Sequence, residues 1–136
     1  MLVYATPDRP RLLHVAETSV DGRWLLISSV EGTDARVELS VVDLTAPKLA
    51  SRTLVRELEN DWRLAGTRGD IFYFVTDLEA PRRRIVSIDV GSDMRRRREI
   101  VPQATDPIAD ARLVGDRLLV TVLRDCLLYT SPSPRD

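Results

Sequence analysis

One short unit occurs three times in the chain: Asp21-Gly22-Arg23-Trp24-Leu25-Leu26, then Gly69-Asp70-Ile71-Phe72-Tyr73-Phe74, then Gly115-Asp116-Arg117-Leu118-Leu119-Val120. Each copy places a turn that contains Gly and Asp directly before an apolar run, which is typical of a tight turn that leads into a buried strand. Trp24 and Phe72 lie 48 positions apart, and Gly69 and Gly115 lie 46 positions apart. The chain therefore repeats a structural unit of nearly constant length.

The strand that follows this unit repeats as well. Residues 37–44 and 85–90 alternate apolar and polar side chains, and Asp43 and Asp89 lie 46 positions apart. Short apolar stretches follow at 52–55 and 98–101, so one period holds about four strands. Apolar residues show an arguable helical spacing only over residues 51–58. A repeat of 40–50 residues with four strands is typical of a β-propeller blade, and the predicted fold class is all-β.

The chain holds about two and a half four-stranded blades, over residues 14–58, 61–102 and 108–123. Propellers close with roughly four to eight blades. We therefore expect a partial propeller, that is, a fragment of a larger protein. Open blade edges favour aggregation, so the chain alone is expected to self-associate.

Two prolines, Pro132 and Pro134, stand where the third blade needs another alternating strand. Proline cannot donate to a β-ladder and is excluded from central strands. We therefore divide the chain into a propeller fragment, residues 1–125, and a tail, residues 126–136. The tail is either disordered natural sequence or foreign sequence joined to the fragment.

Composition excludes several classes of function. The 136 residues carry 20 basic and 21 acidic side chains. Two arginine clusters, residues 82–84 and 95–98, have acidic neighbours that neutralise them: Asp77, Glu79, Asp89, Asp93 and Glu99. Neither nucleic acid nor a membrane is therefore an expected partner. No apolar run approaches the roughly 20 residues that span a bilayer, and the first residues lack a signal-peptide pattern. A single cysteine, Cys126, excludes an internal disulfide. The expected location is the cytoplasm.

The sequence offers little catalytic chemistry. It contains no nucleophile-elbow, phosphate-loop or zinc-binding motif. His14 is the only histidine, and it is expected to pack or cap rather than catalyse. The turn aspartates Asp21, Asp70 and Asp116 are expected to bond to their own backbone, and the same role is expected of Asp43 and Asp89. We predict no catalytic residue, no metal site and no cofactor.

Seven stretches, in unbroken order, resemble the N-terminal propeller of prolyl oligopeptidases: residues 3–10, 16–28, 31–34 (Glu-Gly-Thr-Asp), 60–62 (Asn-Asp-Trp), 72–77, 80–89 and 99–102. The resemblance implies a seven-bladed propeller that covers an α/β-hydrolase domain and admits short peptides, which are cut after proline. The Ser-Asp-His triad belongs to that hydrolase domain, so no triad residue is carried over. The resemblance also implies that Leu13 and Thr33 face the substrate, although the family usually has Met and Cys there.

Two functions stay open from the sequence. The first is a fragment of a prolyl oligopeptidase whose partners are the hydrolase domain and, through it, a short peptide; the fragment itself is inactive. The second is a non-enzymatic propeller that binds a protein partner.

Overall fold

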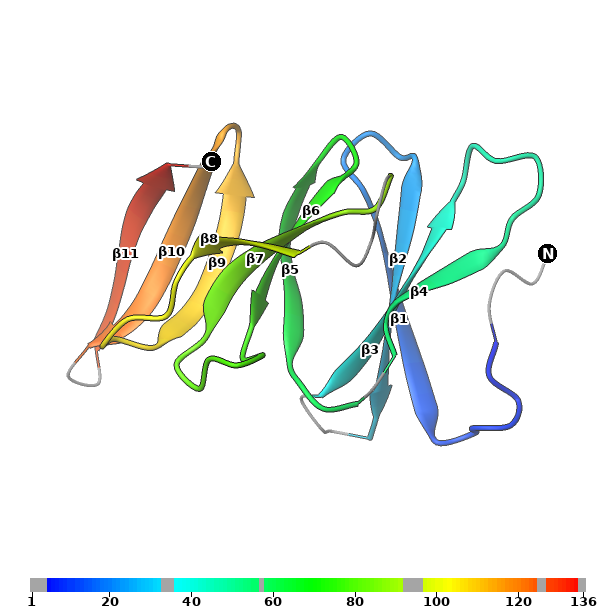
Figure 1. Cartoon of the computed structure of the whole chain (residues 1–136), viewed down its shortest axis with the longest axis horizontal. Coiled ribbons are helices and arrows are strands. Elements are labelled where there is room, and N and C mark those ends of the chain that lie inside the picture. Colours follow the sequence, from blue (N-terminus) through cyan, green and yellow to red (C-terminus); the bar gives the residue numbers. More distant parts are fainter. Residues whose placement is uncertain (1–4, 33–35, 57, 92–96, 125–126, 135–136) are drawn as a thin grey trace. The chain divides into compact units, whose positions relative to one another are not determined.

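The computed structural model describes residues 5–32, 36–56, 58–91 and 97–124, and the backbone of 127–134. These residues form eleven strands in three antiparallel sheets and contain no helix (Figure 1), so no helix there could cross a membrane. The chain divides into two compact units, Met1–Asn60 and Asp61–Asp136. The predicted all-β class and partial propeller are confirmed.

The first unit is one sheet of four strands in chain order: β1 (Leu12–Thr18), β2 (Trp24–Glu31), β3 (Val37–Asp43) and β4 (Ser51–Val55). Most of its apolar side chains on β2 and β3, among them Trp24, Leu26, Leu39 and Val41, are almost fully buried. β1 lies at the edge of this sheet, and of its residues only Leu12 is buried.

The second unit holds two sheets. One contains β5 (Trp62–Arg68), β6 (Ile71–Thr76), β7 (Arg84–Asp89) and β8 (Arg97–Val101); the other contains β9 (Ile108–Val114), β10 (Arg117–Arg124) and β11 (Leu127–Pro134). Apolar side chains of both sheets, such as Tyr73, Val75, Ile108 and Leu118, form one core cluster. Adjacent blades of a propeller pack in this face-to-face manner.

Two of the three predicted glycine turns, at Gly69 and Gly115, are tight hairpins of this second unit, whereas Gly22 lies in the longer connection between β1 and β2, residues 19–23. Gly69 and Gly115 have φ of +58° and +60°, and the aspartate that follows each has a negative φ. Each turn has two residues, because Arg68 pairs with Ile71 and Val114 pairs with Arg117. A positive φ at the first central position only is the pattern of a type II′ turn, which favours glycine there.

The tail departs from the prediction. Residues 127–134 pair with β10 along its whole length, with Pro132 opposite Leu119 and Pro134 opposite Arg117. β11 is the edge strand of its sheet, and an edge strand tolerates proline because its outer side needs no ladder hydrogen bond. The expectation that the strand pattern stops before these prolines is wrong. The origin of residues 126–136 stays a prediction.

Candidate functional site

Leu13, one of the two predicted substrate-facing residues, lies near the start of β1. Its side chain is 58% exposed, and its backbone pairs with Val30 of β2. Beside it, the segment that leads into β1 and the end of β2 enclose an open hollow of about 290 Å³, lined by Asp8, Arg9, Pro10, Arg11, Leu12 and Glu31. Thr33 lies outside the described residues.

Charges of both signs line this hollow. Arg9 is fixed by a bidentate contact in which its two terminal nitrogens donate to the Glu38 carboxylate at 2.7 and 3.0 Å. Arg11 lies 3.9 Å from Glu31, and its side chain is 86% exposed. The first pair organises the segment before β1, whereas the second leaves the Arg11 guanidinium accessible to solvent.

His14 bridges two hydroxyls. Its Nε2 lies 3.0 Å from Thr6 Oγ1, and its Nδ1 lies 2.8 Å from Ser29 Oγ. A serine beside a histidine resembles a nucleophile and its base, but Ser29 is only 1% exposed, so no substrate reaches its hydroxyl. The bridge ties the segment before β1 to β2, which fits the structural role predicted for His14.

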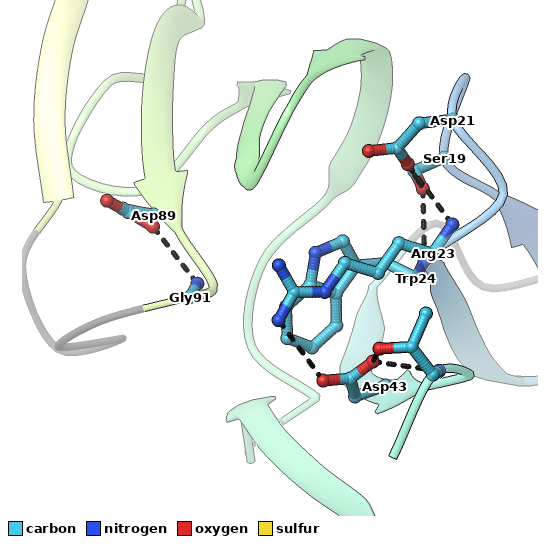
Figure 2. Close-up of polar contacts among 8 residues, drawn as sticks. Ser19, Asp21, Arg23, Trp24, Asp43, Asp89 and Gly91 are labelled. Carbon is cyan, nitrogen blue, oxygen red and sulfur yellow. Dashed lines mark hydrogen bonds and ion pairs between the residues drawn. The ribbon is translucent and has the colours of Figure 1, made fainter.

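Turn aspartates in the first unit accept hydrogen bonds from their own loops (Figure 2). Asp21 accepts from the Ser19 hydroxyl at 2.6 Å and from the Arg23 backbone at 3.1 Å. Asp43 accepts from the Thr45 hydroxyl at 2.6 Å, the Thr45 backbone at 3.0 Å and the Arg23 guanidinium at 3.3 Å. The Ser19 bond lowers the pKa of Asp21, and the Thr45 bonds lower the pKa of Asp43 to about 2. Both carboxylates act as turn acceptors.

The corresponding aspartate of the second unit does the same. Asp89 accepts from the Gly91 backbone at 3.0 Å (Figure 2), and the Asp70 carbonyl accepts from the Val90 backbone at 2.9 Å. Among the residues that the structure describes, no group of three or more His, Cys, Asp or Glu side chains could hold a metal ion. The turn role predicted for these aspartates therefore holds for Asp21, Asp43 and Asp89.

A charged cluster around Asp61 was not predicted. The Asp61 side chain is 10% exposed and lies 3.3 Å from Arg63 Nε and 3.2 Å from Arg83 Nη2. Its backbone N–H donates to the Asp77 carboxylate at 2.9 Å. Burial raises the pKa of Asp61, and the two guanidinium groups oppose that rise. The cluster fastens the β6–β7 loop to the start of β5.

In the first arginine cluster, residues 82–84, Arg84 pairs with a predicted acidic neighbour, whereas the partner of Arg83 was not among those predicted. Arg83 pairs with Asp61, and Arg84 donates to the Leu78 carbonyl at 3.0 Å and pairs with Glu99 at 3.4 Å. In the second cluster, Arg97 lies over the Trp62 ring, 5.2 Å from its centroid, and Arg95 and Arg96 lie outside the described residues. Neither described part forms a bare basic face.

The sequence model of the prolyl oligopeptidase N-terminal β-propeller domain matches residues 1–128. The chain belongs to this family. Its repeated antiparallel sheets are accordingly propeller blades, as the sequence predicted.

Similar proteins are several times longer. The dual function macrocyclase-peptidase POPB of Galerina marginata is 25% identical over 129 residues, which cover 91% of this chain and 18% of that protein. Prolyl oligopeptidase A of Amanita bisporigera is 23% identical over 113 residues, which cover 80% of this chain and 15% of that protein. The chain thus spans less than a fifth of the length of these relatives.

Solved structures of the family contain the same fold. A chain from a structural and mechanistic study of two prolyl endopeptidases superposes with a TM-score of 0.90 at 31% identity, covering 97% of this chain and 20% of that one. The apo structure of prolyl oligopeptidase B from Galerina marginata superposes with a TM-score of 0.89 at 22% identity, covering 98% of this chain and 20% of that one. This second similarity, at 22% identity, supports the assignment of the fold and nothing further.

Proposed function

We propose that these residues are part of the seven-bladed propeller of a serine-type endopeptidase that cleaves short peptides after proline. The observation that carries the proposal is the family match over residues 1–128. The relatives named for peptidase activity are several times longer than this chain, which supports a hydrolase domain elsewhere in the parent protein.

In this proposal the propeller excludes large substrates from the hydrolase active site. A ring of blades over a hydrolase site admits a short flexible peptide but not a folded protein, and it shields the reaction from bulk water. Steric exclusion needs no acid or base, and the candidate groups of this chain are engaged in their own turns and sheets. The 136-residue chain alone is therefore expected to be inactive.

Leu13 is the described residue that we place on the substrate-facing side. Its apolar side chain is exposed on β1, one residue after Leu12, which lines the hollow, and we propose that it contacts an apolar residue of a peptide. Thr33 is proposed for the same role from the family resemblance.

The test begins with the gene beyond codon 125 in the source DNA. We expect the reading frame to continue into further blades and a nucleophile-elbow motif. The longer product should cleave a fluorogenic peptide after proline but not the same peptide with alanine in place of proline, and the 136-residue chain should cleave neither. A frame that continues into blades alone would refute the peptidase and favour a non-enzymatic binding propeller.

Leu13→Ala in the longer product tests the substrate-facing role. If Leu13 makes an apolar contact that is equally strong in the ground state and the transition state, loss of that contact should raise KM for the peptide several-fold and leave kcat unchanged. Val15→Ala, two residues further along the same strand, is the matched control and should leave both constants unchanged. Equal effects of the two substitutions would refute the assignment.

A further inference from the structure

Asp21 and Gly22 form the only pair in the 136-residue sequence in which an aspartate precedes a glycine. In such a pair the backbone nitrogen of the glycine can attack the side-chain carboxyl carbon of the aspartate, because glycine has no side chain that hinders the approach. Both residues are exposed in the connection between β1 and β2, so water reaches them. The pair is therefore a candidate for spontaneous covalent modification.

The reaction is a dehydration followed by a hydrolysis. A bond forms between the Gly22 nitrogen and the Asp21 Cγ, the carboxyl OH leaves as water together with the amide proton, and a succinimide ring results. Water then opens the ring at one of its two carbonyl carbons. Opening at Cγ restores aspartate, whereas opening at the backbone carbonyl carbon of Asp21 produces isoaspartate, in which the main chain runs through the side-chain carbons. No oxidant and no cofactor take part.

The turn directs the Asp21 carboxylate away from the nitrogen that would attack it. Asp21 Oδ1 accepts from the Ser19 hydroxyl at 2.6 Å and from the Arg23 backbone N–H at 3.1 Å (Figure 2), so the carboxylate faces the amide that follows the glycine. The Ser19 bond, followed by the Arg23 bond, also lowers the pKa of Asp21. The ionised carboxylate lacks the OH that must leave when the ring closes.

The attacking nitrogen is engaged as well. The Gly22 N–H donates to the Ser19 carbonyl at 2.9 Å, whereas ring closure requires this nitrogen to lose its proton and to turn toward the Asp21 Cγ. Ser19 is itself 4% exposed, and its hydroxyl accepts from the Trp24 backbone N–H at 3.0 Å. One buried residue therefore holds both reacting groups, the carboxylate through its hydroxyl and the amide through its carbonyl.

We propose that Asp21–Gly22 is a site of isoaspartate formation in this chain and that Ser19 controls the rate by holding the Asp21 carboxylate and the Gly22 amide apart. The pair reacts in the unfolded chain and is protected in the folded one. Conversion adds one carbon atom to the main chain of the turn, next to the bond of 2.9 Å from the Ser19 N–H to the Trp24 carbonyl, and so weakens the closure of the β1–β2 hairpin.

Peptide mapping of the 136-residue chain, incubated at neutral pH in buffer and in guanidinium chloride, tests the proposal. Isoaspartate at position 21 is detected by methylation with an isoaspartyl methyltransferase, and the succinimide by a mass lower by one water. We expect conversion in the denaturant and conversion that is roughly 10-fold slower or more in buffer, because the folded turn must first open. Asp43–Leu44 and Asp89–Val90, in which a branched side chain follows the aspartate, are internal controls and should convert in neither solution.

Ser19→Ala tests the controlling residue. Loss of the hydroxyl releases the Asp21 carboxylate and should raise the rate in buffer roughly 5- to 10-fold. Because Ser19 is buried, this variant also loses stability, so a control with a defect elsewhere in the same sheet is needed. Ile27→Val removes one methylene group from a side chain of β2 that is 3% exposed, leaves the turn unchanged and should leave the rate unchanged. In guanidinium chloride all three chains should convert equally fast.

Equal rates in buffer and in denaturant overturn the proposal, and so does the absence of isoaspartate at position 21 from both solutions. A Ser19→Ala variant that converts no faster than the unmodified chain contradicts the role of Ser19. Equal acceleration by Ser19→Ala and Ile27→Val assigns the protection to the stability of the whole sheet and contradicts that role too.

Discussion

At Gly66 the two sheets of the second unit approach closely, and substitution of this residue by alanine tests that packing. A Cβ atom at residue 66 would lie 2.6 Å from Leu113 Cβ and 3.4 Å from Leu113 Cδ2. Ordinary carbon contacts are about 3.5–4.0 Å, so the sheets must separate by roughly 1 Å. Rotation of the Leu113 side chain gives no relief, because its Cβ is fixed to the backbone.

The magnitude follows from two opposing effects. Overpacking of this kind destabilises by about 1–3 kcal/mol. Replacement of glycine at an unstrained position recovers about 0.4–1 kcal/mol through the lower entropy of the unfolded chain. We expect Gly66→Ala to lower the free energy of unfolding of the second unit by about 1–2 kcal/mol and its Tm by roughly 4–16 °C.

Tryptophan fluorescence separates the two units, because Trp24 lies in the first and Trp62 in the second. In a Trp24→Phe background, thermal and urea unfolding followed through Trp62 report the second unit. Leu113→Gly removes the opposing Cβ and serves as the control background, where Gly66→Ala should be neutral or stabilising. An equal loss of stability in both backgrounds, or none in either, would refute the proposed contact.

Three other predictions concern turns and loops. The depressed pKa of Asp43 means that the contribution of this carboxylate to stability is present above pH 3.8 and is lost as the pH falls toward about 2. Thr45→Val removes the hydroxyl that lowers this pKa most, so the pKa of Asp43 should rise toward 3.8, as measured by NMR titration of its carboxyl carbon. Gly115→Ala should destabilise the second unit by about 1 kcal/mol, because its φ is +60° and the space around it is open, so the change in Tm isolates backbone strain. Arg83 has φ +71° and pairs with Asp61, so Arg83→Ala loses the ion pair but keeps the backbone strain, whereas Arg83→Gly loses both. In urea unfolding the glycine variant should be more stable than the alanine variant by about 1 kcal/mol, and the opposite order would contradict the backbone strain.

The sequence predicted the buried second and third strands of the first two blades because these elements carry strong local signals. Apolar runs such as residues 71–76 follow turn residues directly, and their spacing repeats. The first strand of each blade gives a weaker signal. β1 is exposed at every residue but Leu12, so it lacks the alternation of apolar and polar residues that marks a half-buried strand.

The parts that the sequence did not predict depend on distant partners. Asp61 meets Arg83 across 22 positions, and only the hairpin of β5 and β6 and the loop after it bring them together. Pro132 and Pro134 argue against a strand locally, yet pairing with β10 places them in one, because an edge strand has only one ladder to satisfy. Bulges at Leu54, Ala65, Ile100 and Ala109 are equally invisible in the sequence, since each is a property of two paired strands.

The candidate chemical groups of the described residues share one property: a neighbour in the fold already engages them. His14 is held between two hydroxyls, Asp21 and Asp43 accept from their own turns, and Asp61 is enclosed by two arginines. A catalytic carboxylate or imidazole needs a hydrogen-bonding position that is open to the substrate, but in these groups neighbouring residues of the fold occupy those positions. A ligand of the first sheet could therefore contact the exposed edge of β1, which includes Leu13, and the hollow at the start of this strand. These features provide a surface of a given shape and backbone groups, and no acid–base chemistry. The proposed function requires a surface of this kind, because rigid loops and a rim without acid–base groups would select peptides by size without competing for the bond to be cleaved.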